Sequence, residues 1–345
     1  MLKIMFNRKI LLIVISLFVG VAVYFAGSPA PDVRVGDVRS GCLGEDEVAE
    51  YKLEKVQEFI GRATITTHDS KTQGRQFSVQ DVMLHTYHPV EVRQCGVYVI
   101  REFNYDFKRS EPLPGFRVEL WRYEYPGRGE RLLDLAGYAP EARGAAVVSY
   151  SYDFRIDSQE RYLVLARGYL GSPDFAIVIK DLKTLEDVFV FPIAEVAKKN
   201  PDIIGDVGFY QGWSKDSRYF WADFFGGAPV FGYVRIDSNT WTYDLFPAPP
   251  DVLGGDQLNI ETGWLTVHPG NIWFGFAEED EAEKAKRRAQ GIGTDLYIEN
   301  LLTKERLFVA HTDEPLHYFK PKWLSDTELE YFLPDGERRV YRIPE

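Results

Sequence analysis

The sequence is poor in sulfur, with two cysteines and three methionines among 345 residues. Two cysteines cannot build the disulfide framework of a small secreted domain, and the spacing of Cys42 and Cys95 matches no zinc motif. In an oxidising compartment the two thiols can pair, and closing that loop is worth about 4 kcal/mol. Two free thiols are the alternative, and we predict the disulfide.

Signatures of catalysis are also missing. The sequence has no Gly-x-Ser-x-Gly elbow, no phosphate-binding glycine loop and no calcium-loop pattern of aspartates. We therefore expect no cofactor and no resident metal ion, and we favour a binding protein over an enzyme.

Positive charge is in short supply. The net charge is −12, and the only charged side chains before residue 30 are Lys3, Arg8 and Lys9, which leaves −15 for the remainder. Such a surface repels phosphate backbones. Nucleic acid is therefore excluded as the expected partner.

One long hydrophobic run is present, at residues 10–27, behind a short basic segment at residues 1–9. Eighteen helical residues span about 27 Å, close to the hydrocarbon thickness of a bilayer. Basic flanking residues keep the N-terminus in the cytoplasm, so we predict a single-pass signal anchor in the cell membrane. The alternative is a signal peptide cleaved after Ala30, although Pro31 disfavours that cut. Both interpretations place residues 31–345 outside the cytoplasm.

Residues 28–57 are expected to link the anchor to the folded domain. The first part, Ser28 to Gly44, is rich in Pro and Gly and predicts a loose tether. Apolar residues then recur at helical spacing between Glu45 and Ile60, which predicts one short helix.

The remaining chain, residues 58–345, has the composition and periodicity of a β-propeller. Aromatic residues make up 14% of the sequence, which favours half-buried strands. A unit of strands separated by Asp/Ser and Gly/Pro turns recurs every fifty to sixty residues; for example, Arg161-Tyr162 returns 57 positions later as Arg218-Tyr219. We therefore predict an all-β, five-bladed propeller behind an N-terminal transmembrane helix.

A six-bladed propeller is the alternative, with Arg75 to Val92 forming part of an extra, irregular blade. The last blade has only three predicted strands and would leave an unpaired edge. We expect the segment Phe59 to Thr67 to supply the missing strand and so close the ring.

The repeat resembles a known family. Trp-Ser-Lys-Asp-Ser at 213–217 and Trp-Leu-Ser-Asp at 323–326 are similar to the Trp-Ser-Pro-Asp-Gly repeat of TolB-like β-propellers, which are related to WD-type repeats. Lys215 stands where that family has proline, and Ser217 where it has glycine. The resemblance implies a scaffold of the kind found in binding proteins and in non-catalytic domains of peptidases.

Two sets of repeated residues are expected to be structural. Aspartates in blade turns accept backbone N–H bonds and fix the turns: Asp157, Asp216 and Asp326. Tryptophans at blade spacing are expected to pack between blades: Trp213, Trp264 and Trp323.

Four other carboxylates lie near predicted inner-strand ends and are weak catalytic candidates: Asp153, Asp206, Glu261 and Asp313. If two of them converged in an axial pocket, the protein could be a carbohydrate-active hydrolase. That activity is the alternative to binding.

The loops between the second and third strands of each blade are rich in aromatic residues. We predict that exposed anchors on these loops recognise a protein or a glycan: Tyr105, Phe107, Tyr169, Phe175, Phe225 and Phe231. In the fourth blade the same loop, Glu278 to Gln290, is acidic first and basic later, which predicts a short charged helix. Ordinary turns and a solvated insertion are the alternative. A purely structural envelope protein would lack an organised pocket altogether.

Overall fold

The structure is a computed structural model, and it describes most of the chain after residue 41. The described residues are 42–43, 47–57, 60–68, 76–84, 89–106, 111–125, 128–135, 154–168, 173–202, 206–225, 230–249, 257–269 and 277–344. The expected anchor at 10–27 lies outside these ranges. Inside them, no helix has the length and apolar character needed to cross a bilayer.

The first sheet contains seven strands in the order β1-β2-β3-β5-β6-β7, with β4 also paired to β5. β3 joins β5 only through the pair Val82–Arg101, so the sheet consists of two meanders. Its strands are β1 (Val48–Gln57), β2 (Ile60–His68), β3 (Gln76–Met83), β4 (Val90–Val92), β5 (Val97–Asp106), β6 (Glu111–Glu124) and β7 (Arg128–Asp134).

Four further antiparallel sheets follow along the described chain. The second holds β8 (Phe154–Ile156), β9 (Tyr162–Arg167), β10 (Ala176–Asp181) and β11 (Asp187–Phe191), and α2 (Ile193–Lys199) leads out of it. The third holds β12 (Asp206–Trp213), β13 (Tyr219–Phe225), β14 (Val230–Asp237) and β15 (Thr242–Pro247). The fourth holds β16 (Trp264–Val267), β17 (Thr294–Asn300) and β18 (Arg306–Thr312), with α3 (Ala277–Ala289) between the first two. The fifth holds β19 (Lys322–Trp323), β20 (Glu328–Phe332) and β21 (Arg338–Arg342).

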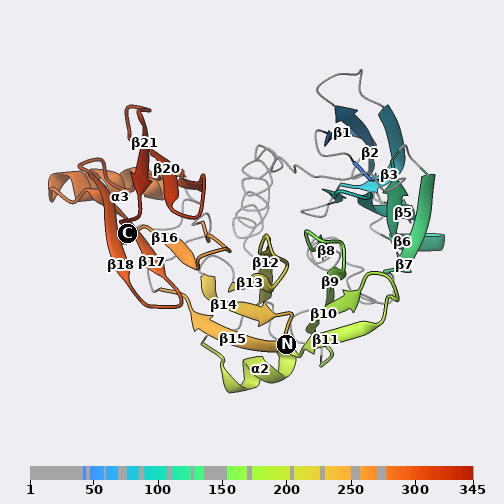
Figure 1. Cartoon of the computed structure of the whole chain (residues 1–345). Coiled ribbons are helices and arrows are strands. Elements are labelled where there is room, and N and C mark those ends of the chain that lie inside the picture. The colour runs from blue at the N-terminus through green and yellow to red at the C-terminus, as the bar shows by residue number, and fades with distance from the viewer. Residues whose placement is uncertain are drawn as a thin grey trace, which may run out of the picture.

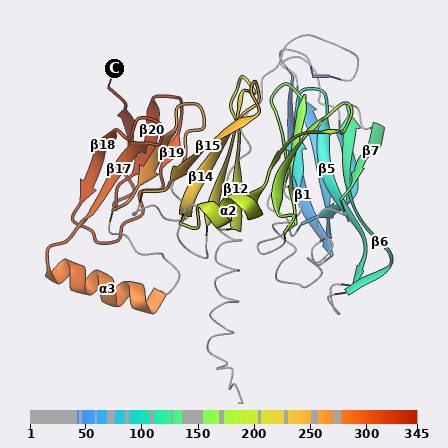
Figure 2. The ribbon, with the colours of Figure 1, turned by 90° about the horizontal axis from the view of Figure 1, so that it is seen from below.

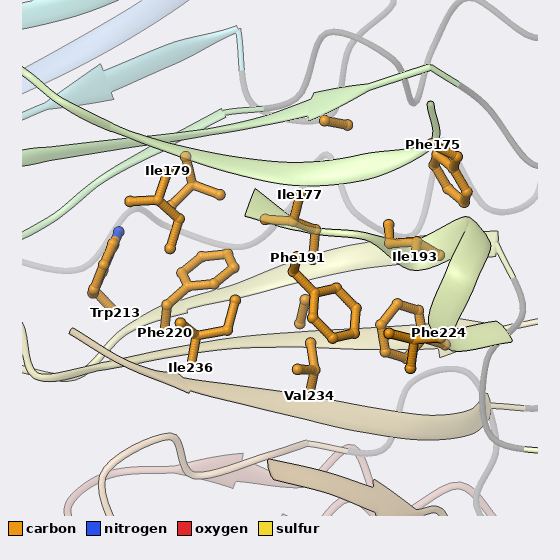
Figure 3. Close-up of a cluster of buried hydrophobic side chains, with 14 residues drawn as sticks. Phe175, Ile177, Ile179, Phe191, Ile193, Trp213, Phe220, Phe224, Val234 and Ile236 are labelled. Atoms are coloured by element: carbon orange, nitrogen blue, oxygen red, sulfur yellow. The ribbon is translucent and has the colours of Figure 1, made fainter. Parts of the chain in front are cut away.

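These sheets follow one another around an arc, and each packs its face against the next (Figure 1). Between the second and third sheets, for example, Ile177 and Phe191 from one side meet Phe220 and Val234 from the other (Figure 3). Consecutive antiparallel meanders that share cores in this way form a β-propeller fold. The all-β propeller prediction is therefore confirmed, and the predicted charged helix is present as α3.

The predicted blade turn is a repeated hydrogen-bonded unit. Its closing bond runs from the N–H of Asp157 to the carbonyl of Tyr162 (3.1 Å), and the bond from Ser214 to Tyr219 (2.8 Å) is equivalent. Asp157 is fully buried, and its Oδ1 also accepts the N–H of Tyr162 (2.7 Å). Asp216 accepts the N–H of Arg218 (3.0 Å). Both aspartates have the predicted role.

The corresponding turn of the fifth sheet differs. There the hydroxyl of Ser325 accepts the N–H groups of Thr327 (3.3 Å) and Glu328 (3.1 Å). Asp326 instead binds Lys215 Nζ of the third sheet (2.9 Å). The prediction for Asp326 is wrong because a neighbouring hydroxyl can satisfy the same donors.

The repeated tryptophans pack between sheets, as predicted. Trp213 stacks on Tyr162 of the second sheet with ring centroids 5.7 Å apart. Trp264 and Trp323 belong to the core between the fourth and fifth sheets.

Two predictions about the N-terminal part are wrong. Residues 48–57 form strand β1 rather than a helix, because β1 pairs with β2 along its length and turns Tyr51 and Leu53 toward the core. The predicted domain boundary at 57 therefore falls inside a hairpin. Strand β2 also does not complete the last sheet, since it lies between β1 and β3 in the first. Local hairpin pairing costs less loop entropy than pairing across the whole chain.

Cys42 and Cys95 form the disulfide that we predicted, with an S–S distance of 2.02 Å. Next to it, Leu43 is buried and its N–H donates to the carbonyl of Gln94 (2.8 Å). Glu160 of the second sheet accepts the N–H of Cys95 (2.5 Å). The disulfide thus lies at the junction of the first two sheets.

Candidate functional site

A shallow, open depression of about 410 Å³ lies on the first sheet. It is lined by Arg101 and Phe103 of β5, Arg117, Glu119 and Trp121 of β6, and Arg131 of β7. The lining residues lie in the middle of β5 and β6, whereas the connection between these two strands starts after the pair Asp106–Glu111. Figure 2 shows the β5–β6 end of the first sheet and α3 at the same edge of the molecule.

Strand alternation creates the depression. Ile100 of β5 and Val118 and Leu120 of β6 face the second sheet and are fully buried. Side chains of odd number on the same strands point to the other face. The β1–β3 meander covers part of that face by packing on Val97 and Val99. The six lining residues occupy the rest.

Arg101 is the anchor of the depression. Its guanidinium donates to Asp81 Oδ2 (2.8 Å), to the carbonyl of Gln80 (3.0 Å) and to the hydroxyl of Tyr123 (3.3 Å). Only 16% of its side chain is exposed. These bonds hold the guanidinium in one orientation and neutralise it with one carboxylate.

Cations and aromatic rings alternate across the depression. The guanidinium carbon of Arg101 lies 4.7 Å from the ring centroid of Phe103 and 4.9 Å from that of Trp121. Arg117 lies over Phe103 at 4.9 Å. Each contact is within the range of a cation–π interaction, worth about 0.5–1 kcal/mol at a partly exposed site.

Glu119 forms the floor. Its carboxylate accepts a hydrogen bond from Trp121 Nε1 (2.9 Å) and lies 3.3 Å from Arg131 and 3.6 Å from Arg117. The Glu119 side chain is only 4% exposed, whereas those of Arg117 and Arg131 are 52% and 55% exposed. One buried carboxylate therefore orients two guanidinium groups whose outer faces meet solvent.

Three guanidinium groups line the depression. Glu119 and Asp81 contribute two carboxylates, and Asp134, the cross-strand partner of Glu119, places a third on the same face of the sheet. The charges of these side chains balance. Planar guanidinium groups bind carboxylates and phosphates in a bidentate manner, which suits the half-exposed Arg117 and Arg131 to an anionic group.

Glu102 lies on the opposite face of β5 from the depression. It is buried between the first two sheets, and burial raises its pKa to about 8. Its neighbour Glu119, one strand away, faces guanidinium groups instead. The two sides of this strand pair thus hold carboxylates in contrasting environments.

The predicted aromatic anchors differ in burial and in position. Phe175 is buried in the core between the second and third sheets, so its prediction as an exposed anchor is wrong. Phe231 is half-buried. Tyr105 and Phe225 lie in β5 and β13, at the loop ends of those strands. The two others, Phe107 and Tyr169, lie outside the described residues.

Two of the four catalytic candidates, Glu261 and Asp313, lie far apart. Glu261 lies in the turn before β16, whereas Asp313 follows β18 at the other end of the fourth sheet. The 7 residues of β18 span about 20 Å, too far for a two-carboxylate mechanism. Asp206 opens β12 opposite Phe225, at the loop end. Asp153 is outside the described residues.

Glu261 connects the fourth sheet to the third. Its carboxylate accepts the N–H of Lys215 from the third sheet (2.8 Å). Burial raises its pKa, and the nearby Lys215 opposes that effect. Asp313 is fully exposed and lies 3.3 Å from His311. Neither carboxylate lines the depression.

The sequence interpretation singled out none of the six lining residues. A signal was present, because the polar or aromatic residues at 117, 119 and 121 alternate with the apolar residues Val118 and Leu120. This alternation places Arg117, Glu119 and Trp121 on one face. What the pattern cannot give is the adjacent strand, which brings Arg101 and Phe103 alongside.

No family model matches the chain, and no curated protein matches it. Solved structures that it resembles include the β-propeller domain of the trilobed protease of Pyrococcus furiosus, at a TM-score of 0.43 and 10% identity over 86% of this chain and 78% of that one. The acylaminoacyl peptidase of Pyrococcus horikoshii gives 0.42 and 8% over 87% of this chain and 44% of that one. An oligogalacturonate lyase gives 0.41 and 13% over 92% and 97%. At these scores the propeller assignment rests on the sheet topology of this chain itself, and no family is assigned.

Proposed function

We propose that this protein is a binding scaffold, a membrane-anchored β-propeller outside the cytoplasm that holds a glycan or a protein. The observation that carries the proposal is the arginine-lined depression on the face of the first sheet that points away from the second sheet, where Arg117 and Arg131 are oriented but half exposed. Polar groups fixed around an open hollow are typical of binding sites.

The location is part of the proposal. Residues 10–27 act as a single-pass anchor, with residues 1–9 in the cytoplasm and the propeller outside. The Cys42–Cys95 disulfide supports this location, because cytosolic thiols are kept reduced.

The blade count and the family are also proposals. The described strands form five hydrogen-bonded sheets, which supports five blades. The β1–β3 meander packs on the β4–β7 strands as a layer of its own, which supports the alternative of six. The Trp-Ser-Lys-Asp-Ser turn at 213–217 supports a relation to TolB-like propellers. In such a scaffold the turns build the fold and the loops carry the function.

The carbohydrate-active hydrolase remains the second candidate, with fewer carboxylates to support it. Two members of its carboxylate set, Glu261 and Asp313, lie at opposite ends of the fourth sheet. A structural envelope protein without an organised pocket is less favoured, because Glu119 orients Arg117 and Arg131 in the lining of the depression.

The test uses the full chain in detergent micelles or intact membrane vesicles. We expect glycan or protein ligands to bind without turnover and protease added outside the cell to cut the propeller. Release of cleaved sugar would identify a hydrolase. Protection of the propeller from external protease in intact cells would overturn the proposed location.

A further inference from the structure

We infer that this protein associates with a second copy of itself through sheet edges, strand β1 of one chain pairing with strand β21 of the next. The two strands lie at opposite ends of the arc of sheets (Figure 1). Each is the outermost strand of its sheet, so each has one edge without a strand partner in the described part of the chain. Such assembly is separate from the binding function proposed above.

The fifth sheet is one strand short. In the second, third and fourth sheets, two strands follow the first strand after the blade turn, for example β10 and β11 after β9. In the fifth sheet only β21 follows β20 among the described residues. β21 therefore corresponds to β10 and β14, and both of those strands have an outer partner. A strand of a second copy takes the place of that partner.

The other outer strands carry features that hinder further pairing. A shift of register interrupts the pairing of β7, β11 and β18 with their neighbours, and β15 ends in Pro247, which has no N–H to donate. β21 instead pairs with β20 without a shift, and β1 pairs with β2 without a shift from Val48 to Lys55. Bulges and prolines protect sheet edges, so the two ends of the arc present the regular edges among the described outer strands.

The charges of the two strands match in one register. With Lys52 opposite Val340 in an antiparallel pair, two pairs of opposite charge form: Glu50 with Arg342 and Glu54 with Arg338. A shift of two residues in either direction sets Lys52 directly opposite an arginine. Like charges directly opposite each other destabilise a strand pair. The pattern of charge therefore selects the first register.

The neighbouring strands continue this alternation of charge. Glu54 pairs with Arg62 of β2 (2.7 Å), and Arg342 pairs with Glu328 of β20 (2.8 Å). Both pairs lie directly across their strands. Across the two copies, Glu54 then lies between two arginines, and Arg342 lies between two glutamates.

The same register joins the apolar faces of the two strands. Tyr51 and Leu53 of β1 pack on the core of the first sheet, and Tyr341 of β21 packs on the core between the fourth and fifth sheets. Tyr51 falls opposite Tyr341, on the same face of the combined sheet. A shift of one residue would turn these tyrosines toward charged side chains, so both faces specify one register.

The experiment measures self-association of the full chain in detergent micelles by sedimentation, and cross-linking between cysteines placed in the two strands. Lys52→Cys and Val340→Cys each change an exposed side chain. We expect a mixture of these two variants to form a link between chains, and a mixture of Lys52→Cys with Glu186→Cys, in a turn of the second sheet, to form none. Because the two edges differ, association should continue to rings or longer chains.

A charge substitution tests the register. Glu50→Arg sets two arginines opposite each other and should weaken self-association at least about threefold. Glu186→Arg is the matched control, because it makes the same change of charge at an exposed position away from both edges, and it should leave self-association unchanged.

Each other outcome overturns a stated part of the inference. A chain that carries both cysteines and links only within itself, as a monomer, overturns the second copy as the partner. A monomer at all concentrations without any link overturns the pairing altogether. Self-association that Glu50→Arg leaves unchanged and that gives no link belongs to another surface. None of these outcomes bears on the ligand binding that tests the scaffold function.

Discussion

Single residues on β5 and β6 show how a strand pair sets the chemistry of a carboxylate. Glu119 is buried against Arg131 and Trp121, which supply donors to it. Glu102, on the other face, is buried between two sheets, and burial raises its pKa to about 8. The sequence alone does not distinguish these two environments, because each depends on what packs over that face of the sheet.

The raised pKa of Glu102 predicts a stability that falls with rising pH. Between its ordinary pKa of 4.5 and about 8, the folded protein holds a proton that the unfolded chain has lost. The free energy of unfolding then falls by at most about 1.4 kcal/mol per pH unit in this window. Denaturant unfolding at several pH values should show this decline, and Glu102→Gln should flatten it. An unchanged slope in Glu102→Gln, or an equal change in the exposed control Glu186→Gln, would contradict the prediction.

The buried turn aspartate makes a second prediction. Asp157 accepts the N–H groups of Arg161 (2.6 Å) and Tyr162 (2.7 Å). Asp157→Ala leaves these donors without their acceptor, at a cost of about 2–3 kcal/mol. The exposed Asp216 is the control, and Asp216→Ala should cost less than about 1 kcal/mol. Equal losses in thermal or denaturant unfolding would show that burial does not decide the role.

Elements are held together by apolar faces that meet between successive sheets. Phe191 of β11 is fully buried, 4.7 Å from the ring of Tyr243 and 6.1 Å from that of Phe224. Phe308 of β18 is 52% exposed. The two phenylalanines have the same chemistry and differ in the layer that covers them.

We expect Phe191→Ala to lower the free energy of unfolding by about 3–5 kcal/mol, because it leaves a cavity between two sheets. Phe308→Ala should cost less than about 1 kcal/mol. Denaturant unfolding of the two variants measures the difference. A small effect of Phe191→Ala would mean that the second and third sheets do not share the core shown in Figure 3.

The described sheets follow an arc (Figure 1), and cross-strand ion pairs lie on the sheets at both of its ends. On the last sheet, Glu328 pairs with Arg342 (2.8 Å), and Glu330 pairs with Arg338. On the first meander, Arg62 pairs with Glu54 (2.7 Å). Antiparallel sheets commonly leave one face to water, and these cross-strand ion pairs suit that position. The described strands therefore end the propeller without joining its first and last sheets by hydrogen bonds.

The disulfide gives a prediction at this scale. Cys42 and Cys95 are 53 positions apart, and opening a loop of that length costs about 4 kcal/mol. Cys42→Ser or reduction should lower the free energy of unfolding by up to that amount. In cells, an alkylating reagent should label neither thiol before reduction. Labelling without reduction would contradict both the disulfide in vivo and the proposed location.

The sequence by itself determined the all-β class, the blade turns and the packing of Trp213, Trp264 and Trp323, because each depends on short-range patterns of alternation and turn chemistry. It also indicated the pairing of Cys42 with Cys95, since no other cysteine was available. These features repeat along the chain and can be recognised without knowing which strands are neighbours.

Only the tertiary structure decided where residues 48–68 pair, which aromatic side chains are buried and where the lining of the depression comes together. Helical and strand periodicities are hard to separate in a short segment such as 48–57 until its partner β2 is known. Phe175 and the lining residue Phe103 are both phenylalanines, and only the neighbouring sheet buries one and leaves the other beside Arg117. Burial depends on the layer above a strand, which the sequence of that strand does not contain.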